Sequence, residues 1–302
     1  MIEKRPIVLT SGSLPPLLGD LPKRPNALFL RGELPRGPAV AIVGTRAPTE
    51  EGVQFAHELA AELAQAGVAI LSGGARGIDT AAHRGALSVD GVTAVIAPAG
   101  FCRPYPPENA ALFEEIVERA GAYAALVPDD QPATRPGFFA RNACLAALCH
   151  ALVLVQCGLR SGARNAVAHA RRIGRPVFVV PSCPWIPSGR GGLQELRRGA
   201  ELCEGARDVL RWLRNAGHQP VSCRDGSALA ASPDSSDGTG LGDTEDGSAA
   251  RVLALVEGGV THVDELSRKT GLSVGVLQAR LLELCLRGGL CLNPDGTYCR
   301  KH

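Results

Sequence analysis

The 302-residue sequence lacks most of the features that assign a chain to a specialised class of protein. No apolar run approaches the roughly 20 residues that a membrane-spanning helix requires, so no membrane partner is expected. Residues 1–30 lack the uninterrupted apolar stretch of a signal peptide, which indicates a cytoplasmic location. The ten cysteines include no C-x-x-C pair, and neither a zinc site nor a disulfide framework is predicted.

Motifs for cofactor binding and catalysis are also missing. Residues 44–49 read G-T-R-A-P-T, not the G-x-G-x-x-G of a dinucleotide site, and no G-x-x-x-x-G-K-[ST] loop occurs. Asp79 and His83 lie at i, i+4 and could mimic a catalytic pair. The favoured interpretation is that Asp79 caps or braces a glycine loop. We therefore expect no cofactor, no metal and no enzymatic activity.

The basic residues that are present are unevenly distributed. Residues 131–214 carry 13 basic and 4 acidic side chains, whereas residues 1–130 carry 11 basic and 15 acidic ones. A strongly basic segment inside a near-neutral chain favours a surface that faces a polyanion. A solvated arginine-rich face is the alternative.

Residues 39–182 alternate short apolar runs with helical patterns. The near-continuous apolarity of these runs is typical of a parallel sheet buried on both faces. The alternation predicts an α/β fold with a doubly wound, mostly parallel, extended Rossmann-like sheet at residues 39–214. Residues 1–38 are expected to form a lead-in that packs on this core. The predicted strands are 39–44, 68–73, 92–97, 122–127, 151–156 and 176–181.

The character of the sequence changes after residue 214. Residues 215–247 are small, polar and glycine-rich, which predicts a flexible linker. Residues 248–302 contain three helical patterns and a hairpin that turns at residues 294–296, which predicts a small winged-helix domain. Because residues 245–302 carry seven basic and seven acidic side chains, protein docking is favoured over DNA contact for this domain.

Four segments rich in glycine or arginine lie where ligands of a doubly wound sheet bind, at the carboxyl ends of the strands. Backbone N–H groups of such turns can cradle a phosphate. Arginine beside an aromatic ring is the combination that single-stranded nucleic acid requires, although burial of both phenylalanines in the core is the alternative. The segments are the loops 44–48, 72–79, 135–142 and 159–165, with Arg46, Arg76, Arg141, Arg164, Phe138 and Phe139.

These segments resemble the DNA-processing protein A family, also called Smf. The resemblance covers residues 14–213 and is carried by "AIVGTRAP" (41–48), "LSGGARGIDTAAHRGAL" (71–87), "YPPEN" (105–109), "GFFARN" (137–142) and "SGARNAVAHARRIGRPVFVVPS" (161–182). It implies a protein that binds single-stranded DNA and dimerises. It further implies that incoming DNA is protected and that a RecA-type recombinase is loaded onto it in natural transformation or recombination.

The resemblance also implies a DNA-binding pocket. The matching residues are Gly44, Thr45, Arg46, Ser72, Gly73, Gly74, Arg76, Gly77, Phe138, Arg141, Asn142, Ser161 and Gly162. Relatives often read F-P-R-R-N-R where residues 138–143 read F-F-A-R-N-A, so Ala140 and Ala143 replace basic side chains. A dimer contact is expected near residues 195–213, with Leu210, Trp212 and Leu213 as apolar anchors.

Two other functions stay open at this point. A Rossmann-type enzyme of the phosphoribohydrolase kind, acting on nucleoside monophosphates, would resemble a "GGGxG" loop followed by a glutamate, and this chain has neither. A DNA-binding regulator would act through the winged helix, whose balanced charge weakens that interpretation.

Overall fold

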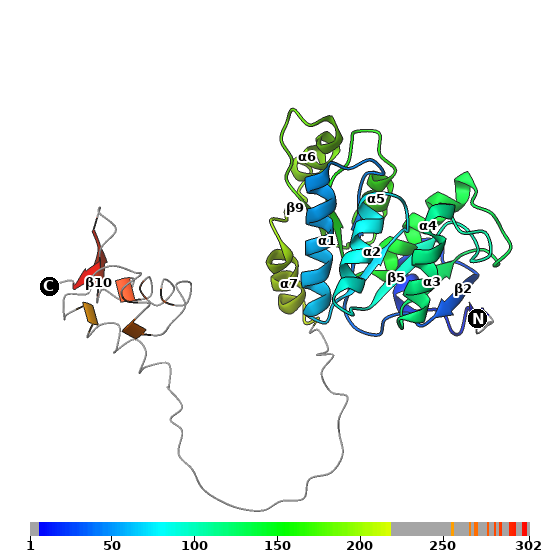
Figure 1. The fold of residues 1–302 in the computed structure, drawn as a ribbon, viewed down its shortest axis with the longest axis horizontal. Coiled ribbons are helices and arrows are strands. Elements are labelled where there is room, and N and C mark those ends of the chain that lie inside the picture. Colours follow the sequence, from blue (N-terminus) through cyan, green and yellow to red (C-terminus); the bar gives the residue numbers. More distant parts are fainter. Residues whose placement is uncertain are drawn as a thin grey trace, which may run out of the picture. The chain divides into compact units, whose positions relative to one another are not determined.

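The computed structural model describes residues 6–218 and a set of shorter pieces near the C-terminus. The pieces are 255–256, 266, 269–270, 277, 281, 284–285, 290–293 and 298–300. The chain divides into two compact units, Met1–Ala228 and Leu229–His302 (Figure 1). In the parts described, no helix is long and apolar enough to cross a membrane.

The first unit contains a nine-stranded sheet in the order β1-β2-β6-β5-β4-β3-β7-β8-β9. Strands β3 to β9 pair in parallel, while β2 runs antiparallel to both β1 and β6. From the central strand β3 the chain winds outward through β4, β5 and β6 in one direction and then through β7, β8 and β9 in the other, which confirms the predicted doubly wound fold. The strands are β1 Ile7–Thr10, β2 Ala27–Gly32, β3 Ala39–Val43, β4 Ala69–Ser72, β5 Thr93–Ala97, β6 Ala122–Ala125, β7 Ala151–Leu154, β8 Val177–Val179 and β9 Glu201–Leu202.

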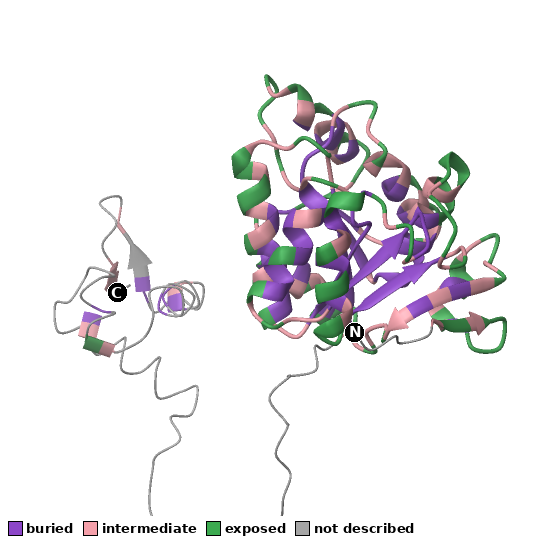
Figure 2. Cartoon of the chain, turned by 45° about the vertical axis from the view of Figure 1, so that its right-hand side comes forward, coloured by how far each residue is buried: buried purple, intermediate pink, exposed green. Residues whose placement is uncertain are grey.

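Helices cover both faces of this sheet. Side chains alternate along a strand, so Ala41 and Val43 of β3 join one apolar cluster while Val40 and Ile42 join the other. Figure 2 shows the buried residues on the strands and on the inward sides of the helices, with exposed residues on the outer sides. The helices are α1 Glu50–Gln65, α2 Ile78–Ser88, α3 Ala110–Glu118, α4 Arg135–Leu148, α5 Ala163–Arg172, α6 Arg190–Arg197 and α7 Ala206–Asn215, with the 3-10 turns η1 Pro16–Asp20, η2 Pro107–Asn109 and η3 Pro187–Gly189.

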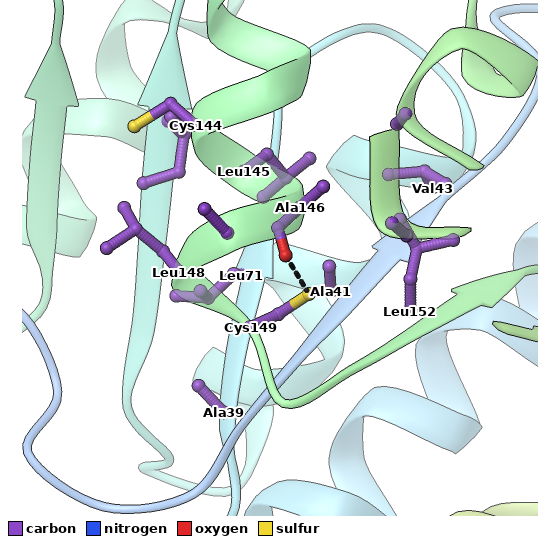
Figure 3. Packing of buried hydrophobic residues seen from close by; sticks show 14 of the residues in the cluster. Ala39, Ala41, Val43, Leu71, Cys144, Leu145, Ala146, Leu148, Cys149 and Leu152 are labelled. Atoms are coloured by element: carbon purple, nitrogen blue, oxygen red, sulfur yellow. Dashed lines mark hydrogen bonds between the residues drawn. The ribbon is translucent and has the colours of Figure 1, made fainter. Parts of the chain in front are cut away.

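The second half of α4 packs on the centre of the sheet through small side chains (Figure 3). Cys144 and Cys149 are fully buried there, and the Cys149 Sγ donates to the Ala146 carbonyl oxygen at 3.3 Å. Burial raises the pKa of both thiols to about 12. These cysteines therefore act as small apolar residues, as the sequence indicates.

The lead-in does more than pack on the core, because β1 and β2 extend the sheet beyond β6. Phe29 of β2 lies opposite Ala125 of β6. Leu14, Leu18 and Leu28 are buried in the same cluster as the second half of α4. No strand was predicted in this region, and the two-residue edge strand β9 was not predicted either. The predicted division of the chain at residues 38, 214 and 247 stays a prediction.

Helix α7 carries the three residues that were named as anchors of a dimer contact. Leu213 is fully buried, and Leu210 and Trp212 pack against the cluster that α7 shares with α1 and α2. Within the described chain, these three residues therefore stabilise the first unit itself. Leu210 and Trp212 are half-buried, and a dimer contact near residues 195–213 stays a prediction.

In the second unit, β10 (Leu290–Leu292) pairs antiparallel with β11 (Tyr298–Arg300), with Cys291 opposite Cys299. Six apolar residues are buried together: Val256, Leu266, Leu277, Leu281, Leu284 and Leu290. The pair of strands agrees with the predicted hairpin. Its turn at 294–296, residues 219–247 of the predicted linker and most of the three predicted helices lie outside the described residues.

Candidate nucleic-acid interface

The turn after β3 is held in place by the end of β7. The Thr45 N–H donates to the carbonyl oxygen of Gln156 at 2.7 Å, and the Gln156 side-chain oxygen accepts from the Thr49 N–H at 3.1 Å. A Cβ on Gly44 would lie 2.5 Å from the side chain of Ile78, so only glycine fits there. Arg46 follows at the exposed tip of this turn. The sequence thus presents one arginine on a well-anchored loop.

The glycine-rich segment after β4 is closed by contacts inside the protein. The buried Ser72 hydroxyl donates to the Ile42 carbonyl oxygen at 2.5 Å. The carbonyl oxygen of Gly74 accepts from the Asn109 side-chain amide at 2.9 Å. Gly74 and Gly77 have φ values of +70° and +76°, which other residues rarely adopt. Arg76 pairs with Glu108 on the surface. This segment therefore joins β3 to the turn η2 through its own contacts.

Arg141 does not lie in a loop, as the sequence analysis assumed, but in the second turn of α4. The helix begins early because the Thr134 side chain accepts from the Gly137 N–H at 3.2 Å and Pro136 occupies its first turn. The Arg141 side chain is only 7% exposed. One guanidinium nitrogen lies 4.0 Å from the Asp79 carboxylate. A Cβ on Gly73 would lie 1.2 Å from that same nitrogen, so Gly73 makes room for it.

Asp79 braces the glycine segment, as predicted. Its carboxylate accepts from the Ala75 N–H at 3.3 Å. Burial raises the pKa of the Asp79 carboxyl, and the positive charge of Arg141 and the N–H groups of Ala75 and Gly73 oppose that shift. The Asp79 carboxylate is therefore engaged by contacts within the protein.

His83 does not form a catalytic pair with Asp79. The Thr93 hydroxyl donates to the Ile70 carbonyl oxygen at 2.7 Å, so His83 Nδ1, 2.8 Å from the same hydroxyl, must carry the proton and donate. His83 Nε2 is buried without a partner, and burial lowers the pKa of His83 to about 3. The ring is a neutral core residue.

A cleft of about 640 Å³ lies at the carboxyl ends of β3 and β7, where the winding of the sheet reverses. Eight of the predicted site residues line it: Gly44, Thr45, Arg46, Phe138, Arg141, Asn142, Ser161 and Gly162. The other five, Ser72, Gly73, Gly74, Arg76 and Gly77, lie outside its lining. The structure therefore divides the predicted site into a cleft and the packing behind it.

Aromatic and cationic side chains lie together in the lining of this cleft. The Phe138 ring packs edge-on against Tyr105, with ring centres 5.2 Å apart, and the Arg46 guanidinium lies 5.4 Å from its centre. Phe139 is 50% exposed, so its ring is accessible from solvent. Neither ring is buried in the core, so the alternative interpretation of the two phenylalanines is wrong.

The loop after β7 forms the opposite wall. The side-chain amide of Asn142 donates to the Asn165 side-chain oxygen at 3.1 Å and links α4 to this wall. Arg164 does not face the cleft: its guanidinium donates to the buried Glu195 carboxylate at 2.7 and 2.9 Å. Exposed Arg160 lines the cleft instead. Sequence reasoning missed Arg160, although its place in a basic glycine-containing loop was a usable signal.

Among the residues described, no group of three or more histidine, cysteine or acidic side chains could hold a metal ion. A doubly wound sheet with a cleft rimmed by arginine at its winding reversal defines a Rossmann-like protein whose cleft lies where ligands of this fold bind.

More specifically, the chain belongs to the DNA recombination-mediator protein A family, whose model matches residues 5–214. The DprA winged helix domain matches residues 230–296. Both the fold class and the family expected from the sequence are confirmed.

Individual relatives agree with this assignment. Protein Smf of Escherichia coli is 32% identical over 284 residues, covering 93% of this chain and 74% of that protein. A DprA relative from Mycobacterium tuberculosis is 43% identical over 195 residues, or 63% of this chain. The chain spans about half the length of that relative, 49%.

Two solved structures have the same fold. DprA of Streptococcus pneumoniae is 28% identical, with a TM-score of 0.65 over 69% of this chain and 74% of its own. DprA of Helicobacter pylori, described for its single-stranded DNA binding mode, is 29% identical, with a TM-score of 0.62 over 69% of this chain and 96% of its own.

Proposed function

We propose that this protein binds single-stranded DNA in the cleft between β3 and β7 and acts as a recombination mediator. In this role it protects incoming strands and loads a RecA-type recombinase onto them in natural transformation or recombination. It works in the cytoplasm as a homodimer and catalyses no reaction. Family membership supports this role, as does the single-stranded DNA binding mode of the Helicobacter pylori relative.

One observation carries the proposal: the cleft combines exposed cations with accessible aromatic rings. Arg46 and Arg160 supply charge for a phosphate backbone, and Phe138 and Phe139 supply ring faces for bases. Such a combination suits an unpaired strand, because bases in a duplex are stacked on one another and cannot reach a ring. Gly162, with nothing within 4 Å of its Cβ position, lets the strand approach the backbone closely.

The alternative of a nucleotide-processing enzyme is not favoured. The cleft lining contains a single carboxylate, Asp79, which is buried and tied to Arg141 and the Ala75 N–H. Cleavage of a glycosidic bond generally employs a pair of carboxylates or an equivalent activated group. The described cleft offers no second one.

Fluorescence anisotropy with single- and double-stranded oligonucleotides of equal length tests the proposal. The full chain should prefer the single strand at every salt concentration, and it should hydrolyse neither ATP nor nucleoside monophosphates in parallel assays. Equal affinity for both forms, or turnover that is lost in Asp79→Ala, would overturn it. Nuclease protection, recombinase loading and light scattering then test the finer parts of the role.

A further inference from the structure

A second cleft of about 560 Å³ lies between α4 and the lead-in segment before β2. We call it the lead-in cleft. Its rim carries Lys23, Arg24 and His169, and its walls include Phe139, Ala140 and Ala143. Its volume falls within the roughly 300–1,000 Å³ that small-ligand sites occupy. The cleft is separate from the one between β3 and β7, yet the two share one side chain.

That shared side chain is Phe139. Phe138 and Asn142 face the first cleft from α4, and Ala140 and Ala143 face the lead-in cleft. Phe139 lies between these two sets and lines both clefts, with half of its surface exposed. A chain molecule that passes over Phe139 on leaving the first cleft therefore enters the second.

The chemistry of the lead-in cleft selects the kind of ligand. The two cations on its rim, Lys23 and Arg24, suit an anionic group, and no carboxylate is among its lining residues. Its interior is apolar, because Leu21, Leu126 and the two alanines leave room without offering charge. A ligand that places an anionic group at this rim and a flat ring in the apolar interior matches a nucleotide, with its phosphate and its base.

A partner polypeptide is the other conceivable occupant. An acidic apolar peptide would satisfy the same rim and floor. Continuity with the first cleft through Phe139 favours the nucleotide, since a strand held next door already supplies both phosphate and base. The Asn26 side chain and half-buried His169 add polar groups that can contact a base edge.

We propose that the lead-in cleft is a second nucleotide subsite, which accepts the next base of the strand after it crosses Phe139. This inference rests on the proposed function. It adds that the lead-in segment itself contacts DNA, and that the length of strand bound is set by two clefts in series.

The experiment compares oligo-dT strands of increasing length on the full chain. Ala140→Trp fills the lead-in cleft without touching the lining of the first one. Ala111→Trp is the matched control, because Ala111 is likewise an exposed helical alanine and lines neither cleft. The parent and control should gain affinity at the length that reaches the second subsite. Ala140→Trp should lose that gain, about 5- to 100-fold, and bind the shortest strands normally.

A second variant keeps the test independent of any folding defect in Ala140→Trp. Lys23→Glu changes an exposed surface residue. It should weaken the binding of long strands and flatten the salt dependence of that binding, and it should leave short strands unaffected. A parent that binds no single strand refutes the proposed function. A parent that binds while both variants match it at every length refutes the second subsite alone, as does an equal loss on short and long strands.

Discussion

The loops after β4 and β7 lie at the same edge of the sheet, and both contain glycines beside arginine. In the loop after β4, Cβ atoms on Gly73, Gly74 and Gly77 would all lie within 3 Å of other atoms. In the loop after β7, Gly162 has nothing within 4 Å. The first loop is filled by the protein itself, whereas the second is open. Similar residue types can thus serve packing in one place and a ligand in another.

The same contrast separates two arginines that the sequence treats alike. Arg46 is exposed at a loop tip, while Arg141 is buried against Asp79. A buried guanidinium is costly unless it is paired, so the first role of Arg141 is to stabilise the filled loop after β4 through Asp79. An exposed one is free to meet a phosphate.

The largest effect is expected from Arg141→Ala. It leaves the Asp79 carboxylate buried without its partner, and breaking such a pair costs about 3–5 kcal/mol. Urea unfolding should show this loss, and the double variant with Asp79→Ala should recover part of it. If Arg141→Ala and the parent have the same midpoint of urea unfolding, this pair does not stabilise the loop after β4.

Acid should lower the stability of the first unit through His83 of α2. Its pKa in the folded chain is about 3, below the ordinary 6.5, so between these values the unfolded chain binds a proton that the folded chain does not. The contribution of His83 to the free energy of unfolding is therefore fully present above pH 6.5. It is lost as the pH is lowered towards 3, and the loss is on the order of a few kcal/mol at pH 4. Urea unfolding between pH 4 and 7.5 should show a shallower fall for His83→Gln. Identical slopes for the two proteins would contradict this.

Two glycine substitutions test the contrast directly. Gly73→Ala forces a methyl group onto the Arg141 guanidinium and should cost roughly 1–3 kcal/mol. Gly162→Ala is its control, since its φ of −62° suits alanine and space is open around it. We expect it to leave stability unchanged or raise it by about 0.4–1 kcal/mol. Thermal unfolding of the two variants side by side distinguishes them, and equal losses would erase the contrast.

In the cleft between β3 and β7, Phe138→Ala should reduce the affinity for single strands. Loss of one stacked base costs roughly 1–3 kcal/mol and releases no counterion, so the slope against salt should stay the same. Fluorescence anisotropy across a salt series measures both quantities. Phe138→Trp serves as the control that retains a ring face, and an unchanged affinity in Phe138→Ala would remove this residue from the interface.

The smallest effect is expected from Arg46→Ala. The loss of one phosphate contact should flatten the log–log salt slope by about 0.7 and weaken all sequences similarly. Stability should change by no more than about 0.5 kcal/mol, because the side chain is exposed. Arg36→Ala, also exposed but outside the cleft lining, provides the comparison for charge alone. Parallel salt slopes in Arg46→Ala and the parent would argue against a phosphate contact at Arg46.

Much of the fold could be predicted because β3 to β8 are buried on both faces and read as apolar runs. Strand β9 could not, since its two residues are exposed and too few to show a period. Strand β1 reads I-V-L-T, a β-branched run that was overlooked because it lies outside the alternating pattern of residues 39–182.

The candidate residues were predicted at the carboxyl edge of the sheet because ligands meet parallel strands there, and eight of them line the cleft at that edge. Which polar groups face outward was not predictable. Arg164 is occupied by Glu195, and Arg141 by Asp79, through contacts between residues remote in sequence. Arg160 was overlooked although it lies in the same basic loop as Arg164, because the sequence does not show which arginines are paired in the folded chain.

The pairing of β2 with β6 has a consequence for the order in which the chain is made. Gly32 pairs with Ala122, so the first strands leave the ribosome long before their partner exists. When β6 is complete, its outer edge would be an open template on which another chain could pair. The segment that covers this edge has by then already been synthesised and is tethered to the same molecule. The cap is thus ready before the edge that it protects.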